Sequence, residues 1–239
     1  MTKLSVNINK IATIRNARGG NMPNLLVACT DCEKFGAEGI TIHPRPDERH
    51  IRYSDARELK PLIKTELNIE GNPTPEFIKL VNEVKPVQVT LVPDAVDAIT
   101  SNAGWDTIKN QGFLTEICKE FKSKNIRTSI FVDADTAMVE AAAKCGCDRV
   151  ELYTEAYASN YSIDPKGSIN PYYGAAIMAK ECGIGLNAGH DLSLENLEYF
   201  IRTIPWVDEV SIGHALICDA LYLGLEKTIQ AYLAKIKIF

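Results

Sequence analysis

Eight short runs rich in β-branched residues alternate along the chain with helix-like stretches, in which apolar residues recur three and four positions apart. This alternation constrains the fold more than any other feature of the sequence. Strands separated by helices lie parallel, and such units either close as a barrel or spread as an open doubly wound sheet. The runs are LSVNI (4–8), GITIH (39–43), ELNIE (66–70), VQVTLV (87–92), RTSIFV (127–132), DRVELY (148–153), IGLNAG (184–189) and EVSIGH (209–214).

The number of units favours the closed barrel, and no GxGxxG segment opens a helix after the first strand, as a dinucleotide-binding open sheet would require. We therefore predict an α/β fold, a (β/α)8 TIM barrel, as a single domain over residues 1–239. Two connections, 93–126 and 154–183, are longer than one simple helix needs. We expect extra helices in these long loops, with residues 157–171 as a mobile loop because Gly, Pro and Asn recur there.

Composition narrows the classes of function. A net charge of −5 argues against a broad nucleic-acid-binding surface. No apolar run approaches the roughly 18 residues that span a bilayer, and the first residues lack the apolar core of a secretion signal, so we expect a cytoplasmic protein with no membrane contact. Cys29-x-x-Cys32 and Cys145-x-Cys147 lack the histidines or the second well-spaced pair of a zinc site, so buried free thiols and no metal are expected.

All four histidines, His43, His50, His190 and His214, fall at or just after predicted strand ends. A lone histidine is more often a satisfied core or surface residue, but in a barrel the strand ends meet at one pocket. Histidine is suited to proton transfer near neutral pH, so this clustering indicates chemistry that moves several protons. Glu70 and Glu151 also end strands. Each could be a structural cap or a lysine partner, but beside the histidines they are candidate general bases.

Basic residues in loops of the same face suggest that a phosphate binds there. Arg18, Arg45 and His50 lie in such loops, and arginine presents a fork of donors that matches phosphate oxygens. A surface salt bridge is the alternative, and it explains Arg49 as well as it explains Arg45. The segments NAGH (187–190) and SIGHA (211–215) place glycine where backbone N–H groups can approach an anion, after the two strands that often hold phosphate in barrels.

The chain resembles the pyridoxine 5′-phosphate synthase family from end to end, in the order in which the family carries its motifs. Any one of the matching stretches is a weak signal, whereas together they are highly specific. They are VNINKIATIRNARG (6–19), GITIHPRPDERHI (39–51), LNIE (67–70), LVPD (91–94) with the following Thr100, FVDAD (131–135), VELYT (150–154), LNAGH (186–190) and IGHA (212–215).

This resemblance implies a metal-independent condensing enzyme, a transferase of pyridoxine (vitamin B6) biosynthesis. In the family, 3-amino-2-oxopropyl phosphate and 1-deoxy-D-xylulose 5-phosphate are joined to give pyridoxine 5′-phosphate, inorganic phosphate and water, without a cofactor. The steps are Schiff-base formation, eliminations and ring closure. The resemblance also implies a homo-octamer built as a tetramer of dimers.

Roles for individual residues follow from the same resemblance. It implies that Asn7, His190 with its neighbour Asp191, Gly213 and His214 hold the amino-ketone phosphate. It implies that Arg18, Arg45, His50 and Thr100 hold the deoxyxylulose phosphate. By the same carry-over His43 and Glu70 are proton acceptors, His190 is a proton donor, and Glu151 stabilises the transition state.

The sequence departs from the family pattern at two places. Asn9 and Lys10 stand where many members carry Asp-His, so we expect them to bind substrate and assign them no proton transfer. Asp191 stands where the family commonly has glycine. A carboxylate repels phosphate, so any anion contact at this position is expected to come from the backbone N–H.

Two other functions fit the same residues. A phosphosugar epimerase or isomerase on this barrel would also need acids, bases and a phosphate loop, and bound zinc or iron would favour it. A non-catalytic barrel could bind phosphorylated metabolites without turning them over.

Overall fold

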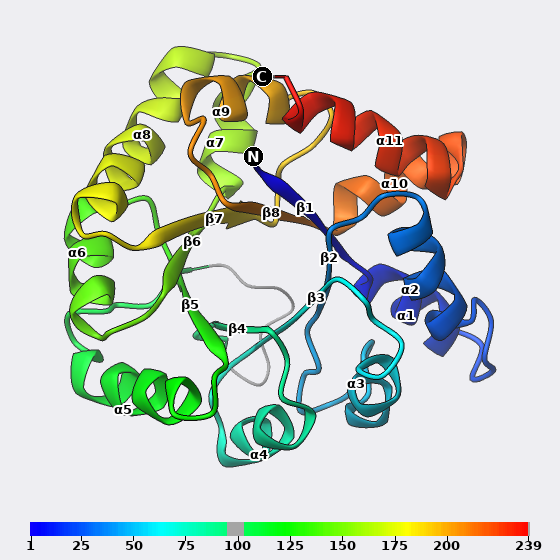
Figure 1. Cartoon of the computed structure of the whole chain (residues 1–239). Coiled ribbons are helices and arrows are strands. Elements are labelled where there is room, and N and C mark those ends of the chain that lie inside the picture. The colour runs from blue at the N-terminus through cyan, green and yellow to red at the C-terminus, as the bar shows by residue number, and fades with distance from the viewer. Residues whose placement is uncertain (95–102, 239) are drawn as a thin grey trace.

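The computed structural model describes residues 1–94 and 103–238, and these form a closed barrel of parallel strands in sequence order (Figure 1). The barrel closes where β8 pairs with β1, with Lys3 opposite Glu209 and Val6 opposite Ile212. The predicted (β/α)8 TIM barrel is therefore confirmed, and every strand lies within two residues of its predicted run. The strands are β1 (Lys3–Asn7), β2 (Gly39–Ile42), β3 (Glu66–Gly71), β4 (Gln88–Leu91), β5 (Arg127–Val132), β6 (Arg149–Tyr153), β7 (Gly185–Gly189) and β8 (Glu209–Ile212).

Strand residues alternate between an apolar outer face and a polar barrel interior, as the two-residue period of a strand requires. Leu4 and Val6 on β1 are fully buried. Between them, the Ser5 hydroxyl lies 2.7 Å from the Thr41 hydroxyl of β2. Thr90 on β4 donates to Glu151 on β6 at 3.3 Å, and since these strands are not neighbours, this hydrogen bond crosses the interior. The interior thus places polar side chains beneath the strand ends.

Helices surround the barrel and cover its apolar outer face (Figure 1). In the connection 154–183, α7 is additional to α8, as the length of that connection predicted. Additional helices also precede α2 and α11, namely α1 and α10. The helices are α1 (Asn9–Asn16), α2 (Leu25–Lys34), α3 (Tyr53–Leu59), α4 (Pro75–Val84), α5 (Gln111–Lys122), α6 (Thr136–Lys144), α7 (Glu155–Tyr161), α8 (Pro165–Glu181), α9 (Leu197–Thr203), α10 (His214–Leu223) and α11 (Leu225–Ile236).

The prediction of a mobile loop over residues 157–171 was wrong. Those residues belong largely to α7 and to the first part of α8. The Asp164 side chain caps α8 by accepting from the Gly167 N–H at 2.9 Å, and Pro165 occupies the first helical turn, where its missing N–H costs nothing. Pro171 lies inside the helix and removes one intrahelical hydrogen bond. Pro165, taken as a sign of a mobile loop, thus starts the helix.

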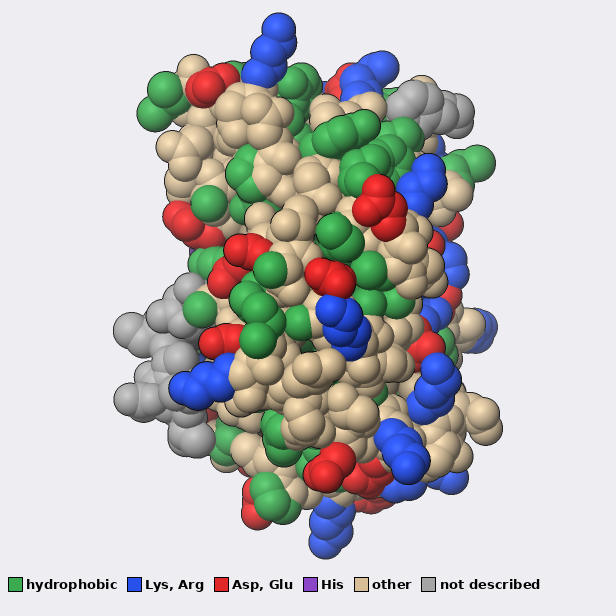
Figure 2. Space-filling model, turned by 90° about the vertical axis from the view of Figure 1, so that its left-hand side faces the viewer, with side chains coloured by type: hydrophobic (Ala, Val, Ile, Leu, Met, Phe, Trp, Pro, Cys, Tyr) green, Lys and Arg blue, Asp and Glu red, His purple; other side chains and the backbone are tan. Residues whose placement is uncertain are grey.

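The thiols of α2 are buried, and charged side chains lie on the outer surface. Cys29 and Cys32 are free and buried in α2, where burial raises the pKa of each thiol to about 12. On the face formed by α5, α6 and α8, acidic and basic side chains are interspersed with apolar ones (Figure 2). Among the described residues, no helix combines the length and the apolar character needed to cross a membrane.

Candidate active site

A cavity of about 540 Å³ opens where the carboxyl ends of the strands meet, and we call it the mouth cavity. It receives residues from the ends of all eight strands or from the loops that follow them. Its lining residues are Asn7, Asn9, Lys10, Thr13, His43, Arg45, Arg49, His50, Glu70, Val92, Phe131, Glu151, His190, Asp191, Ser211, Gly213 and His214.

The mouth cavity gathers most of the residues that the sequence pointed to. All of the expected catalytic residues line it, namely His43, Glu70, Glu151 and His190. The expected binding residues that line it are Asn7, Asn9, Lys10, Arg45, His50, Asp191, Gly213 and His214. Arg18 does not line it, because this exposed residue lies beyond the end of α1. Thr100 lies outside the described residues.

His43, at the end of β2, lies between two carboxylates. Its Nδ1 is 4.0 Å from Glu70 Oε2 and its Nε2 is 4.0 Å from Asp94 Oδ2. Burial lowers the pKa of His43 well below its usual value, and the positive charge of Arg45 adds to that effect. His43 is therefore a neutral imidazole in the unliganded protein, which is the form that accepts a proton.

The two buried glutamates hold protons more tightly than exposed carboxyls do. Burial raises the pKa of Glu70 well above its usual value, and the negative charge of Glu151 raises it further. Burial raises the pKa of Glu151 to about 8, with Glu209 at the opposite end of the barrel as the next cause. Near neutral pH the cavity therefore carries both a neutral base, His43, and a protonated carboxyl, Glu151, so protons can be accepted or donated there.

Glu151→Gln is expected to stabilise the protein at alkaline pH. The pKa of Glu151 is about 8 in the folded state against an ordinary 4.5, so the folded state binds the extra proton. The stability that this proton gives the folded state is complete below the unfolded-state pKa of 4.5, and it is lost as pH rises through the folded-state pKa of about 8. The variant should match the wild type near pH 5 and exceed its free energy of unfolding by about 2–4 kcal/mol near pH 8.5. Urea unfolding at both pH values measures this, and an equal difference at both would contradict the buried-carboxyl account.

Asn7 and Asn9 link the end of β1 to β2 and β3 beside the expected catalytic residues. The Asn9 side-chain oxygen accepts from the His43 backbone N–H at 2.9 Å, and the Asn7 oxygen accepts from the Asn9 N–H at 3.1 Å. The Asn7 amide also donates to Glu70 Oε2 at 3.4 Å. An amide therefore suffices at position 9 to orient His43, while Lys10 supplies a positive charge to the cavity.

The loop after β2 is held in place by two residues of α1. Arg15 makes a buried, bidentate ion pair with Asp55 at 2.7 and 2.8 Å and also donates to the His50 carbonyl at 3.1 Å. Asn16 donates to the same carbonyl at 2.8 Å. The His50 Nδ1 accepts from the Ile51 N–H at 2.9 Å, and burial lowers the pKa of His50 to about 4. His50 is thus neutral with its proton on Nε2, a donor suited to an anion.

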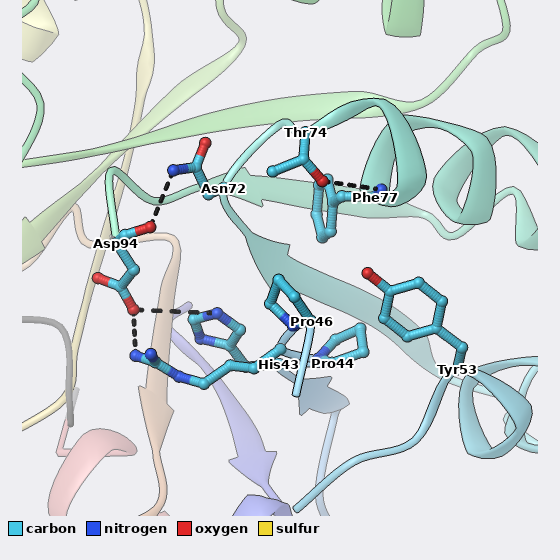
Figure 3. Close-up of a pocket in the computed structure, with 9 residues that line it drawn as sticks. His43, Pro44, Pro46, Tyr53, Asn72, Thr74, Phe77 and Asp94 are labelled. Atoms are coloured by element: carbon cyan, nitrogen blue, oxygen red, sulfur yellow. Dashed lines mark hydrogen bonds and ion pairs between the residues drawn. The ribbon is translucent and has the colours of Figure 1, made fainter. Parts of the chain in front are cut away.

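Arg45 is buried and paired with Asp94, which follows β4. Figure 3 shows the Asp94 carboxylate directed at His43 and the Asn72 amide donating to the Asp94 backbone carbonyl, at 2.8 Å. One carboxylate therefore joins the guanidinium expected to grip a phosphate to the imidazole expected to accept a proton. This link was not predicted, because Asp94 lies far from Arg45 along the chain.

Backbone donors lie at the ends of β7 and β8. Gly213 directly precedes α10, so the helix N-terminus, with its unsatisfied N–H groups and positive dipole end, faces the cavity. Gly189 ends β7 where a Cβ would lie 2.6 Å from the Ser211 carbonyl and 2.9 Å from Glu151 Oε1. Glycine at this position is therefore needed for β7 to pass the Glu151 carboxyl.

Some lining residues were not identified as site residues from the sequence. Arg49 lines the cavity as Arg45 does and pairs with Asp47 at 2.7 Å. Phe131 and Ser211 contribute an apolar and a hydroxyl surface. Their positions near the ends of β5 and β8 could have identified them, but phenylalanine and serine are not residue types that by themselves indicate a site. Within 1–94 and 103–238, no group of three His, Cys, Asp or Glu side chains is arranged to hold a metal ion.

The sequence of the chain matches a family of known proteins. The family model described as "Pyridoxal phosphate biosynthesis protein PdxJ" matches residues 4–238. The pyridoxine 5′-phosphate synthase of Cytophaga hutchinsonii is 68% identical over 237 residues, which are 99% of this chain and 100% of that protein. The pyridoxine 5′-phosphate synthase of Bacteroides fragilis is 66% identical over 232 residues, covering 97% of this chain and 98% of that protein.

Solved structures with low sequence identity share the fold. A 3-keto-L-gulonate-6-phosphate decarboxylase from Vibrio cholerae has a TM-score of 0.68 at 12% identity, covering 100% of this chain and 98% of its own. A phosphoribosyl anthranilate isomerase from Thermotoga maritima has a TM-score of 0.64 at 15% identity, covering 100% of both chains. At such identities the likeness supports the barrel and carries no information on activity.

Proposed function

We propose that this chain, which belongs to the PdxJ family of pyridoxal phosphate biosynthesis proteins, is a pyridoxine 5′-phosphate synthase. It condenses 3-amino-2-oxopropyl phosphate with 1-deoxy-D-xylulose 5-phosphate to pyridoxine 5′-phosphate, inorganic phosphate and water. The observation that carries the proposal is one cavity that brings together acid–base groups and two sets of candidate anion-binding groups.

The two anion-binding sets suit the two phosphates. The deoxyxylulose phosphate binds to Arg45, His50 and Lys10. Its negative charge interacts with the Arg45 guanidinium, which in the unliganded protein pairs with Asp94. Gly213 and His214, at the start of α10, bind the amino-ketone phosphate. Holding both reactants in one cavity makes their encounter effectively unimolecular, because translational freedom has already been lost on binding. For Arg18 and Thr100 the same role rests on the family resemblance alone.

The buried acid–base groups divide the proton transfers. His43 is neutral and accepts a proton at once, whereas burial raises the pKa of Glu70 and so disfavours its ionised form. The ammonium group of the amino ketone favours that ionisation, because an opposite charge stabilises a buried carboxylate. Positive charge that develops on the substrate likewise favours ionisation of Glu151, whose carboxylate then stabilises that charge. His190 returns protons to the leaving groups as water and phosphate are expelled. Several groups are needed because one residue cannot serve every elimination and the ring closure.

The proposal is tested by giving the purified protein both substrates and following the ultraviolet absorbance of the hydroxypyridine ring. We expect absorbance and inorganic phosphate to appear only when both substrates are present. Conversion of one sugar phosphate alone would favour an epimerase or isomerase instead. Tight binding of both substrates with no conversion would favour a non-catalytic binding barrel.

We also propose the homo-octamer that the family resemblance implies, together with a single domain over residues 1–239 and a cytoplasmic location. Apolar side chains at the end of α10 support self-association, since Leu221 and Tyr222 are 72% and 91% exposed. Exposed apolar side chains that form a contiguous patch often belong to a protein interface. Light scattering of the purified protein measures its oligomeric state directly.

A further inference from the structure

His190 and Asp191 are neighbours in sequence whose side chains bind each other. The His190 Nδ1 and Asp191 Oδ2 lie 2.6 Å apart. Adjacent residues point to opposite faces of a strand and do not face each other on a helix. A pairing between side chains at successive positions therefore depends on an unusual backbone conformation.

The chain supplies that conformation in a three-residue turn. The Asp191 N–H donates to the Gly189 carbonyl at 3.1 Å, and His190, at the centre of the turn, has a φ of +73°. This combination is that of the rarer γ-turn, which is strained for a residue with a Cβ. Such strain persists only where the surrounding structure fixes it, and it concentrates at functional sites.

Hydrogen bonds from three directions hold the turn. The His190 N–H donates to the Ser211 carbonyl of β8 at 3.2 Å. The Thr154 hydroxyl donates to the Gly189 carbonyl and accepts from the Asp191 N–H at 3.3 Å. The Asn196 amide donates to the Asp191 carbonyl at 3.3 Å. Because the Asp191 N–H is already engaged by the turn, the expected contact between this N–H and a substrate phosphate would have to break these bonds.

The imidazole ring is also confined by aromatic neighbours. The Tyr153 ring lies edge-on to it, with centroids 5.6 Å apart and planes at 78°. Tyr153 in turn packs against Phe131, with ring centroids 5.4 Å apart. The ring of His190 is therefore fixed at Nδ1 by the carboxylate and against rotation by Tyr153.

We propose that Asp191 is a positioning residue that keeps a proton on His190 Nδ1, so that Nε2 is the nitrogen that exchanges protons with the substrate. The inference rests on the proposed function, in which His190 is a proton donor. In the forward step the Nε2–H bond of the imidazolium breaks and its proton passes to the leaving oxygen. The neutral imidazole that remains keeps its Nδ1–H, which donates to Asp191. The carboxylate stays ionised throughout and takes no proton.

Asp191→Ala is the variant that tests the proposal, with Asp191→Asn as a second variant of nearly unchanged size. Magic-angle-spinning NMR of protein labelled with ¹⁵N in histidine reports which ring nitrogen carries the proton, and a His190→Gln sample assigns the signal. We expect neutral His190 to carry its proton on Nδ1 in the wild type and to shift towards Nε2 in Asp191→Ala. Turnover should fall by about 10- to 100-fold while KM for each substrate changes by less than about threefold.

Glu195→Ala is the matched control, because it removes an equal charge from the same loop four positions away. It should alter neither the His190 signal nor kcat. A wild-type proton on Nε2, or an unchanged signal in Asp191→Ala, would overturn the proposal. Should Asp191→Ala fail to fold, Asp191→Asn decides, since a wild-type kcat in it would overturn the need for a carboxylate. A wild-type protein that shows the expected tautomer but forms no product would contradict the proposed function and leave the pairing intact.

Discussion

Glu70→Gln is expected to lower kcat by about 10² to 10⁴ while leaving substrate binding nearly unchanged. Glutamine keeps the shape of the side chain and can still accept the hydrogen bond that Asn7 donates at 3.4 Å, but it cannot take up or release a proton. Steady-state kinetics gives kcat, and calorimetric titration of each substrate separately gives its dissociation constant. A fall in kcat without a change in binding identifies an interaction made during the reaction.

The pH dependence sharpens this expectation. Burial raises the pKa of Glu70 well above its ordinary value, so Glu70 ionises at higher pH than an exposed glutamate. If the ionised form is the acceptor, kcat/KM of the wild type rises as pH rises through that pKa, and Glu70→Gln loses the rise. Because Glu70 and Glu151 interact, the rise belongs to the pair rather than to one residue.

Glu66→Gln is the matched control for this experiment. Glu66 begins the strand that Glu70 nearly ends, and it lies at the other mouth of the barrel, where it pairs with Lys3 and Arg127. Its kcat should stay within about a factor of three of the wild type, because the substitution is distant from the substrate. Turnover by Glu70→Gln at the wild-type rate would show that Glu70 is not a proton acceptor.

Arg45→Met is expected to reduce both stability and phosphate binding. Arg45 and Asp94 form an ion pair with both side chains about 5% exposed. Removing one member of a buried pair leaves the other charge without its partner, which typically costs about 3–5 kcal/mol. Urea unfolding should show this loss, and KM for deoxyxylulose phosphate should rise because a charge-assisted contact to phosphate is lost.

A double variant separates the two effects. Arg45→Met combined with Asp94→Asn also removes the buried negative charge of Asp94. Most of the lost stability should therefore return, while KM for deoxyxylulose phosphate stays high. Arg57→Met is the surface control, because Arg57 pairs with Glu83 in solvent, and its unfolding midpoint should not move. Recovery of both stability and KM in the double variant would mean that Arg45 does not bind the phosphate.

The fold was largely predictable because local signals agreed with the global pattern. Every strand except β7 contains β-branched residues, and turns such as those at Gly146 and Gly183, with φ values of +80° and +71°, end the preceding helices as glycine permits. The segment 157–171 was mistaken for a loop because Pro165 and Pro171 were counted as breakers. A proline in the first turn starts a helix, and the sequence alone does not show which turn it will occupy.

The site was predictable where a residue sits at a strand end and less so where partners meet across the barrel. His43, Glu70 and Glu151 follow directly from strand register. The Arg45–Asp94 pair was missed because it depends on how two separate loops approach each other. Arg18 lies outside the mouth cavity because it follows the end of α1, and the sequence did not show where that helix would end.

The most direct test of the account is the mass of the product made from amino-ketone phosphate labelled with ¹⁵N and unlabelled deoxyxylulose phosphate. The account predicts pyridoxine 5′-phosphate that contains the labelled nitrogen, with inorganic phosphate released in equal amount. Phosphate release without a labelled ring, or no product at all with verified substrates, would contradict it.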